Sequence, residues 1–204
     1  ITAAKAIADG SGDAEIVNLG TIDGNVLMGA GDDHFNGRYG VLHGKVLGGD
    51  GEDTYVVGSQ PLKIVEKQDQ GMDLVQSTLS YTLSDNLENL TLLGKRDIDG
   101  TGNTGSNSIH GNRGDNLLRG LGGEDVLYGG KGSDRLVGGA AADIFVFNTK
   151  DGHDTIADFK DGKDVIMSNR VTSEADFDDL VAHHLTIKGD DLLIHYGKDT
   201  LRID

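Results

Sequence analysis

The stretch GGKGSDRLVGGAAADIFV, residues 129–146, consists of two frames of nine residues in direct succession. The sixth position of each frame is an aspartate, Asp134 or Asp143, and the eighth is apolar, Leu136 or Phe145. Glycine weakens strands, and aspartates that recur in phase repel one another unless a partner neutralises them. A period this short, with glycine and charge at fixed positions, indicates a repeat architecture.

The frame extends beyond this stretch in both parts of the chain. Frames of nine run without gaps from residue 102 to 146, and GGDGEDTYV at 48–56 fits the frame throughout. GAGDDHF at 29–35 fits it with one residue fewer. In the gapless run the sixth positions are Asn107, Asn116, Asp125, Asp134 and Asp143.

The frame predicts the fold. Six turn residues followed by three extended ones are incompatible with a helix and predict a short strand with one inward apolar side chain. Two frames complete one coil, and equivalent strands of successive coils stack in parallel, as in other solenoids. Glycines allow the positive φ angles that such turns need. We therefore expect an all-β protein, a parallel β-roll or right-handed β-helix solenoid.

The composition limits the function classes. The 204 residues carry a net charge of −16, which disfavours binding to nucleic acid or to an anionic membrane surface. There is no cysteine, which excludes disulfides and thiolate metal sites. No apolar run approaches the ~18 residues of a membrane span. The sequence does not begin with methionine, and we expect a fragment of a longer protein.

The thin core points to a metal. Hydrophobic residues make up 36% of the chain, and one buried apolar residue per frame does not offset the entropy of ordering nine residues. Turns two frames apart share an edge, so that Asp125 faces Asp143 on one edge and Asn116 faces Asp134 on the other. Ca²⁺ takes six to eight carboxylate and carbonyl oxygens, whereas Mg²⁺ and Zn²⁺ suit this donor set less well. We expect several calcium ions in the turns.

The frames at 48–56, 129–137 and 138–146 resemble the RTX, or hemolysin-type, calcium-binding nonapeptide repeat. The stretch 53–94 resembles the spacer between RTX blocks, and 142–168 resembles the segment that closes the final β-roll of secreted proteases, lipases and epimerases. The last residues, 189–204, resemble the terminal strands of such proteins. The resemblance implies a parallel β-roll with calcium in its turns, export by a type I secretion machinery and folding on extracellular calcium.

Carried over by position, the resemblance implies carboxylate ligands in the sixth or an equivalent position, together with backbone oxygens of the turns. Asparagine in the sixth position should weaken or abolish a site, and Ala141 replaces the fourth glycine of the last frame. Three further aspartates, Asp97, Asp99 and Asp115, are interpreted as solvated turn residues. The implied ligands are Asp33, Asp53, Asn116, Asp125, Asp134, Asp143, Asp154, Asp158 and Asp164, with Gly120, Gly122, Gly129, Lys131, Gly138 and Ala140 in the turns.

Four segments are expected. Residues 1–57 form a short irregular first RTX block, 58–97 form spacer strands that continue the solenoid, 98–167 form the regular β-roll, and 168–204 form a C-terminal cap. The cap contains the one convincing helix, at 173–184, with Ser173 as its N-cap.

We therefore expect a non-catalytic, calcium-binding module of a secreted or surface-bound bacterial protein, in which it supports secretion and stability. Calcium and the type I secretion machinery are the expected partners. The alternative is an adhesion, extracellular-polysaccharide-binding or surface-layer module, although no aromatic platform is evident. The sequence has no Gly-x-Ser-x-Gly elbow, while paired acids for glycoside cleavage stay open as a minor alternative.

Overall fold

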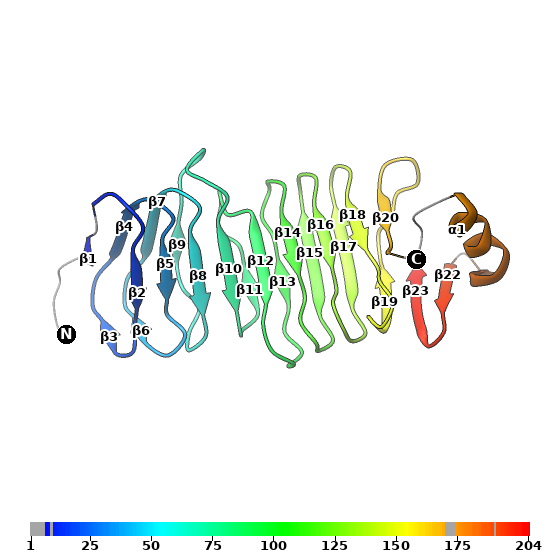
Figure 1. The fold of residues 1–204 in the computed structure, drawn as a ribbon, viewed down its shortest axis with the longest axis horizontal. Coiled ribbons are helices and arrows are strands. Elements are labelled where there is room, and N and C mark those ends of the chain that lie inside the picture. Colours follow the sequence, from blue (N-terminus) through cyan, green and yellow to red (C-terminus); the bar gives the residue numbers. More distant parts are fainter. Residues whose placement is uncertain (1–6, 9, 170–173, 190) are drawn as a thin grey trace. The chain divides into compact units, whose positions relative to one another are not determined.

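The computed structural model describes residues 7–8, 10–169, 174–189 and 191–204. By its internal contacts the chain separates into unit 1, Ile1–Leu92, and unit 2, Leu93–Asp204. Within each unit, short strands stack in parallel on successive coils of the chain (Figure 1). The predicted all-β parallel solenoid is therefore confirmed for each unit.

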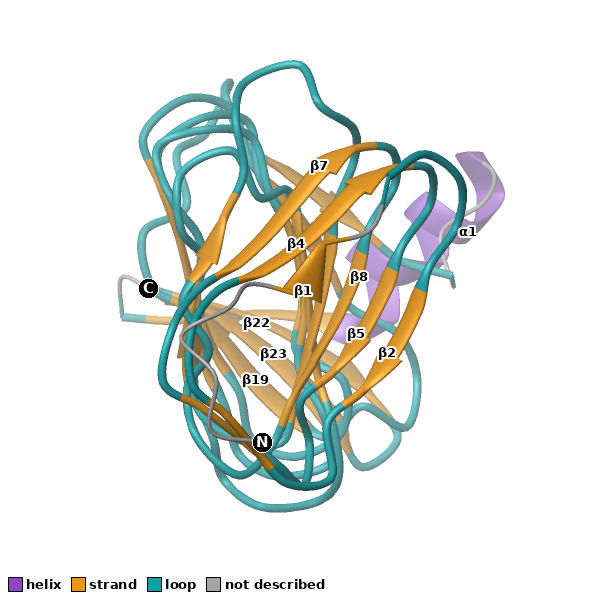
Figure 2. Ribbon diagram, turned by 90° about the vertical axis from the view of Figure 1, so that its left-hand side faces the viewer, coloured by secondary structure: helices purple, strands orange, loops and turns teal. Residues whose placement is uncertain are grey.

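The coils of unit 1 have three faces, and Figure 2 shows two of them, one with β4 and β7 and the other with β2, β5 and β8. Equivalent positions lie about 20 residues apart, as in the bond between Asp33 and Asp53. Phe35 pairs with Tyr55 on neighbouring strands. The first face contains β2 (Glu15–Val17), β5 (His34–Asn36), β8 (Thr54–Val57), β10 (Leu74–Ser77) and β12 (Asn89–Leu92), the second β1 (Ile7–Ala8), β4 (Val26–Ala30), β7 (Val46–Asp50) and β9 (Ile64–Val65), the third β3 (Thr21–Ile22) and β6 (Val41–Leu42), and β11 (Tyr81–Thr82) follows β10 in the chain.

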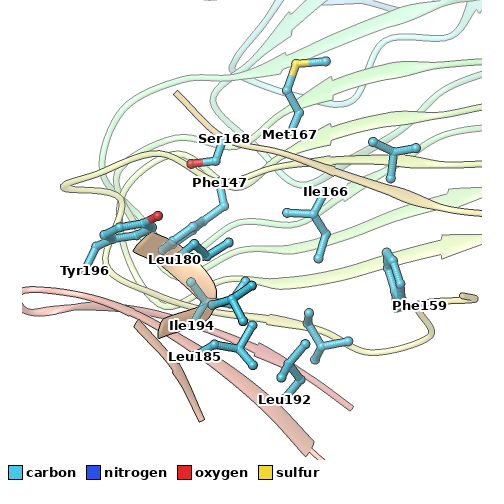
Figure 3. Close-up of a pocket in the computed structure, with 13 residues that line it drawn as sticks. Phe147, Phe159, Ile166, Met167, Ser168, Leu180, Leu185, Leu192, Ile194 and Tyr196 are labelled. Carbon is cyan, nitrogen blue, oxygen red and sulfur yellow. The ribbon is translucent and has the colours of Figure 1, made fainter. Parts of the chain in front are cut away.

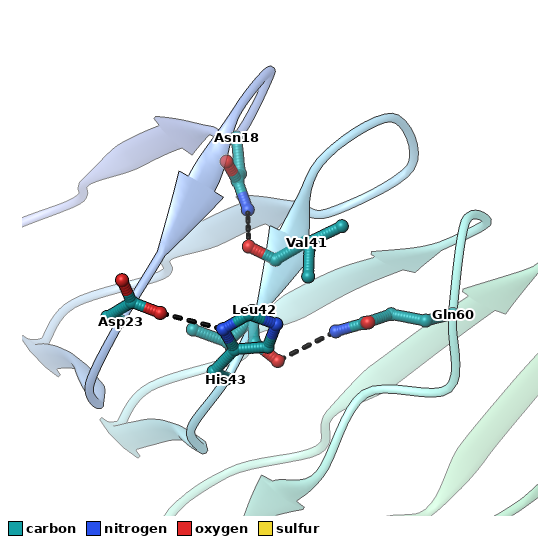
Figure 4. A network of polar contacts seen from close by, with 6 residues as sticks. All are labelled: Asn18, Asp23, Val41, Leu42, His43 and Gln60. Carbon is teal, nitrogen blue, oxygen red and sulfur yellow. Dashed lines mark hydrogen bonds and ion pairs between the residues drawn. The ribbon is translucent and has the colours of Figure 1, made fainter. Parts of the chain in front are cut away.

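Side chains reinforce the third face of unit 1, whose strands are only two residues long. Such short strands supply few backbone hydrogen bonds, and polar side chains add bonds between coils. The bonds drawn in Figure 4 join Asn18 Nδ2 to the carbonyl oxygen of Val41 (3.0 Å), Gln60 Nε2 to that of Leu42 (2.7 Å), and His43 Nδ1 to Asp23 Oδ1 (2.7 Å).

Each coil of the regular part of unit 2 has two faces and 18 residues, as the frame predicts. Leu118 pairs with Leu136 in parallel on one face, and Leu127 pairs with Phe145 on the other. One face contains β14 (Ser108–His110), β16 (Val126–Tyr128), β18 (Ile144–Val146) and β20 (Val165–Met167), and the other β13 (Gly100–Thr101), β15 (Leu117–Leu121), β17 (Arg135–Gly139) and β19 (His153–Ile156).

The core of the regular frames of unit 2 is a stack of the apolar residues in the eighth positions. Ile109, Leu118, Leu127 and Phe145 are fully buried, and Leu136 is 1% exposed. Each of these residues is the inward-pointing side chain of its short strand, since successive side chains of a strand point to opposite faces. The core is therefore one residue deep on each face.

The C-terminal segment closes the stack with a different topology. The last strand, β23 (Asp199–Ile203), pairs in parallel with β19, whereas β22 (Asp191–Tyr196) and β21 (Leu185–Lys188) are antiparallel additions. The predicted helix is observed as α1 (Glu174–Asp179), followed by a π-helical turn, η1 (Leu180–His184). Ser173 lies outside the described residues, so its role as N-cap stays a prediction. In the described ranges, no helix is long and apolar enough to cross a membrane.

Candidate metal centre

A row of buried carboxylates runs along one turn edge of unit 2. The backbone N–H of Asn107 donates to Asp125 Oδ1 at 2.8 Å, and that of Asp125 donates to Asp143 Oδ1 at 3.1 Å. The N–H of Asp143 in turn donates to Asp164 Oδ1 at 3.1 Å. Asp125 and Asp143 are each 1% exposed. Every carboxylate of the row therefore fixes the turn of the coil before it.

The opposite edge repeats this arrangement. The N–H of Asn116 donates to Asp134 Oδ1 at 2.8 Å, and the N–H of Asp134 donates to Asp154 Oδ1 at 3.0 Å. The pairs expected from the frame, Asp125 with Asp143 and Asn116 with Asp134, are thus adjacent in the structure.

Four aspartates of the turns have a second carboxylate oxygen without a hydrogen-bond partner among the described residues. The Oδ2 atoms of Asp33, Asp125, Asp134 and Asp143 are buried and have no hydrogen-bond partner among the residues that the structure describes. A buried polar atom without a partner is costly, and a buried carboxylate is more costly still. A bound cation would stabilise these oxygens.

Backbone carbonyl groups converge on the same positions. A side-chain carbon placed on Gly120 would overlap Asp125 Oδ2 and lie 2.6 Å from the carbonyl oxygen of Gly138, on the next coil. A carbon on Gly111 would overlap the carbonyl oxygen of Gly129. Only glycine leaves this space beside the oxygens. Carboxylate and carbonyl oxygens gathered around such a space are the donor set that Ca²⁺ takes, so the residues fit the ion.

Burial raises the pKa values of these aspartates. The pKa of Asp125 is raised to about 7, first by burial and then by the charge of Asp143. The pKa of Asp134 is raised to about 6 and that of Asp154 to about 8, again first by burial. Burial also raises the pKa of Asp143. Near neutral pH, burial therefore favours the protonated form of these carboxyl groups, and a bound cation would be needed to favour the charged form.

Both polar atoms of the Asn116 side chain, on the second edge, have hydrogen-bond partners within the protein. Asn116 Nδ2 donates to the carbonyl oxygen of Ile98 at 2.6 Å, and its Oδ1 accepts the N–H of Asn112 at 2.8 Å. An amide provides both donor and acceptor here, whereas an aspartate leaves one oxygen without a partner. Ligation by Asn116 stays a prediction.

The remaining predicted ligands take varied positions. Asp164 Oδ2 accepts the N–H of Lys160 at 2.8 Å in addition to its row bond, and Asp158 accepts the N–H groups of Gly138 and Gly139 at 2.9 and 2.8 Å. Ala141 has a φ of +71°, so it keeps the left-handed turn in which other frames have glycine. The N–H groups of the third-position residues donate to carbonyl oxygens of the preceding coil: Gly122 to Asn103, Lys131 to Asn112 and Ala140 to Leu121. Calcium ligation by the carbonyl groups of these third-position residues stays a prediction.

Unit 1 contains a third row. The N–H of Asp33 donates to Asp53 Oδ1 at 2.9 Å, and that of Asp53 donates to Asp73 Oδ1 at 2.9 Å. Asp73 was not expected as a ligand, although its Gly-x-Asp pattern after Gly71 gave a signal. The row therefore extends one coil beyond the predicted first block.

Glu66 is a buried carboxylate beside this row, and the sequence analysis did not identify it. It is 5% exposed, and its Oε2 accepts the N–H of Gly49 at 3.2 Å. Carboxylate oxygens of Asp53, Glu66 and Asp73 all lie within 4.8 Å of one another. The hydroxyl of Tyr55 contacts Glu66 Oε1 and donates to Asp53 Oδ2 at 3.1 Å. Burial, followed by Glu66, raises the pKa of Tyr55, which keeps the hydroxyl protonated as a donor.

The cap of unit 2 contains an apolar cavity of about 470 Å³ between β20, the helical segment and the C-terminal strands (Figure 3). Phe147, Ile166, Leu180 and Ile194 contribute to its wall. Aliphatic and aromatic side chains dominate this lining, which does not offer the carboxylate oxygens of a calcium site. The candidate metal centre is therefore the set of turn rows.

The comparison with protein families agrees with calcium sites in the turns. The family model of the RTX calcium-binding nonapeptide repeat matches residues 101–136 and 120–156, in four copies. No curated protein matches the chain. Among solved structures, the extracellular lipase LipA from Serratia marcescens is similar, with 17% identity and a TM-score of 0.35 over 94% of this chain. The chain spans 36% of that lipase.

Proposed function

Since residues 101–156 are RTX calcium-binding repeats, and unit 2 there forms a parallel β-roll, we propose that the chain is a module that folds on calcium and stabilises a larger secreted protein. The observation that supports this most directly is the set of buried Oδ2 atoms without partners among the described residues, of which those of Asp125, Asp134 and Asp143 each lie beside a glycine. Calcium, when bound, supplies the positive charge that these oxygens otherwise lack.

The ligands proposed in unit 2 come from both turn edges. On one edge, Asp125 Oδ2 and the carbonyl oxygen of Gly138 bind the same ion, because both lie beside Gly120. On the other edge, Asp134 provides the corresponding carboxylate. Binding at one turn also favours the neighbouring turn, because Asp143 both contributes an orphaned oxygen and holds the N–H of Asp125.

The proposed location is outside the bacterial cell, after export by a type I secretion machinery. Extracellular calcium modules typically bind at ~10⁻⁴–10⁻³ M, so a module of this affinity stays unfolded where calcium is scarce. The absence of cysteine is compatible with calcium as the stabilising element in place of disulfides. The proposed role is non-catalytic, and an adjoining part of the protein would supply any activity.

Titration of the metal-free chain with Ca²⁺ and, in parallel, Mg²⁺ tests this proposal. Far-ultraviolet circular dichroism should report a gain of β structure with Ca²⁺ at concentrations where Mg²⁺ has little effect. Isothermal titration calorimetry should count several ions per chain. A chain that binds no Ca²⁺ up to 10 mM, roughly tenfold above the weakest modules of this type, would exclude the proposed function.

A further inference from the structure

Two turns of the chain share their glycine pair, their row aspartate and a buried aromatic residue, and they differ in the hydroxyl group of that residue. GGDGEDTYV at 48–56 lies in unit 1, and GGAAADIFV at 138–146 lies in unit 2. Each begins with two glycines, continues to a row aspartate that is 1% exposed, and has a fully buried aromatic residue in the eighth position. The aspartates are Asp53 and Asp143, and the aromatic residues are Tyr55 and Phe145.

A carboxylate from the following coil binds the glycine pair in both turns. Glu66 Oε2 accepts the N–H of Gly49 at 3.2 Å. Asp158 takes the same role in unit 2, where its two oxygens accept the N–H groups of Gly138 and Gly139 at 2.9 and 2.8 Å. The two turns therefore share their glycines, their row aspartate and their carboxylate from the next coil.

The two turns differ in how the second oxygen of the row aspartate is satisfied. Asp143 Oδ2 has no hydrogen-bond partner in the described part of the chain, and Phe145 has no polar atom to offer. Asp53 Oδ2 accepts a hydrogen bond from the Tyr55 hydroxyl at 3.1 Å, and the same hydroxyl contacts Glu66 Oε1.

The hydroxyl lies in the space that the glycine leaves. A side-chain carbon on Gly48 would overlap the Tyr55 hydroxyl, Glu66 Oε1 and Asp53 Oδ2 together. The corresponding carbon on Gly138 would overlap Asp143 Oδ2, with no hydroxyl among its nearest atoms. In unit 1 the protein thus places a hydroxyl oxygen and its proton beside the glycine, next to the carboxylate oxygen that has no such neighbour in the Asp143 turn.

We propose that the Tyr55 hydroxyl replaces calcium at the Asp53 turn, and that the eighth position of a frame decides whether its turn takes the ion. This inference rests on the proposed function. The oxygens of Asp53, Glu66 and Asp73 have the spacing of a cation site, but the tyrosine oxygen already contacts two of these three groups. An ion ~2.3–2.6 Å from the same oxygens would have to displace a fully buried ring.

Reciprocal exchange of the two aromatic residues tests the proposal. In the full chain, Tyr55→Phe should gain one bound calcium ion, because Asp53 Oδ2 then has no donor. Phe145→Tyr should lose one, because the new hydroxyl satisfies Asp143 Oδ2. Calorimetry and metal analysis of the dialysed protein measure both counts. Tyr81→Phe is the matched control, since it removes another buried tyrosine hydroxyl of unit 1, one that donates to the Leu62 carbonyl at 2.9 Å; its count should equal that of the wild type.

A second variant keeps the test decisive if an exchange impairs folding. Glu66→Gln in the otherwise natural chain should leave the calcium count unchanged, and a loss of one ion would show that Glu66 is a ligand and overturn the proposal. Unchanged counts in both folded exchange variants would overturn it as well. If the wild-type chain binds no calcium at all, the proposed function fails with it, whereas calcium binding without the predicted differences contradicts this inference alone.

Discussion

The backbone N–H of Asp125 donates to Oδ1 of Asp143, 18 residues further along the chain. One oxygen of the carboxylate thus holds the neighbouring turn, and the other has no hydrogen-bond partner among the described residues. The first bond is a structural role that needs no metal. The second oxygen is the reason for expecting one, because burial leaves its charge without stabilisation.

Removal of calcium should abolish most of the β signal of the chain. The core of the regular frames of unit 2 is one residue deep on each face, and the buried carboxylates of a row repel one another when charged and without a cation. Circular dichroism before and after dialysis into calcium-depleted buffer measures the change. A spectrum that stays the same would show that folding does not depend on the metal.

Asp134→Ala should weaken calcium binding about tenfold, equivalent to ~1.4 kcal/mol, because it removes a buried carboxylate with an orphaned oxygen. Asp99→Ala is the control: Asp99 is exposed, and its Oδ1 accepts the N–H of Leu117 at 3.0 Å. Its removal should change the affinity by less than a factor of about two, within the ~0.5 kcal/mol usual for surface substitutions. Calorimetry compares the two variants after their folding in saturating calcium has been verified, and equal losses would contradict the assigned register.

The calcium-free chain should gain structure as the pH falls from 8 to 4. Burial raises the pKa of Asp125 to about 7 and that of Asp154 to about 8, while an unfolded aspartate titrates near ~3.9. The folded state therefore binds more protons in this window, so the stability it gains is complete below pH ~4 and is lost as the pH rises through 7 and 8. Circular dichroism in calcium-depleted buffer measures this trend, and a β signal that grows with rising pH would refute it.

Calcium affinity should follow the opposite trend. Protons and Ca²⁺ compete for the carboxylates of Asp125 and Asp134, whose pKa values are raised to about 7 and about 6. Affinity should therefore fall between pH 8 and pH 5, as measured by calorimetry at constant ionic strength. An affinity that does not change over this range would exclude these two carboxylates as ligands.

Leu121→Gly should stabilise the folded chain by up to ~1 kcal/mol. Leu121 has a φ of +81°, which costs a non-glycine residue ~1–2 kcal/mol, and the gain is partly offset by the greater entropy of glycine in the unfolded chain. The residue is 48% exposed, so little burial is lost. Leu117→Gly, on the same strand at an ordinary backbone angle, should instead destabilise by ~0.5–1 kcal/mol. Thermal unfolding in saturating calcium distinguishes the two.

The strict frame made much of unit 2 predictable. A repeat of nine fixes which side chain of each strand points inward, as Leu127 does, and which aspartates of neighbouring coils meet, as Asp125 and Asp143 do. These features follow from spacing alone, because every coil of the run has the same length. Calcium ligation itself is not fixed by spacing, and it stays a proposal for each residue.

The hydrogen bonds of Glu66 and Asp158 to glycine pairs could not be predicted from the repeat. Both carboxylates reach a glycine pair on the preceding coil, Glu66 from the predicted spacer and Asp158 from the exit of the roll. The coils that contain these two carboxylates are not 18 residues long, as the 20-residue separation of Asp53 and Asp73 shows for unit 1. A constant frame therefore does not show which glycine pair each carboxylate faces. The antiparallel pairing of β21 and β22 likewise follows from their contacts in the cap and has no counterpart in the repeat.

The bonds of each carboxylate row all point the same way along the chain. The acceptor always belongs to the coil nearer the C-terminus and the donor to the coil before it, as in Asn107 with Asp125 and Asp125 with Asp143. An ordered coil thus offers its carboxylate as an acceptor to the coil before it. If that later coil is disordered, the turn before it loses this hydrogen bond. The side-chain anchor of each turn in a row is therefore supplied from its C-terminal side, so loss of a coil removes this bond from the coil before it.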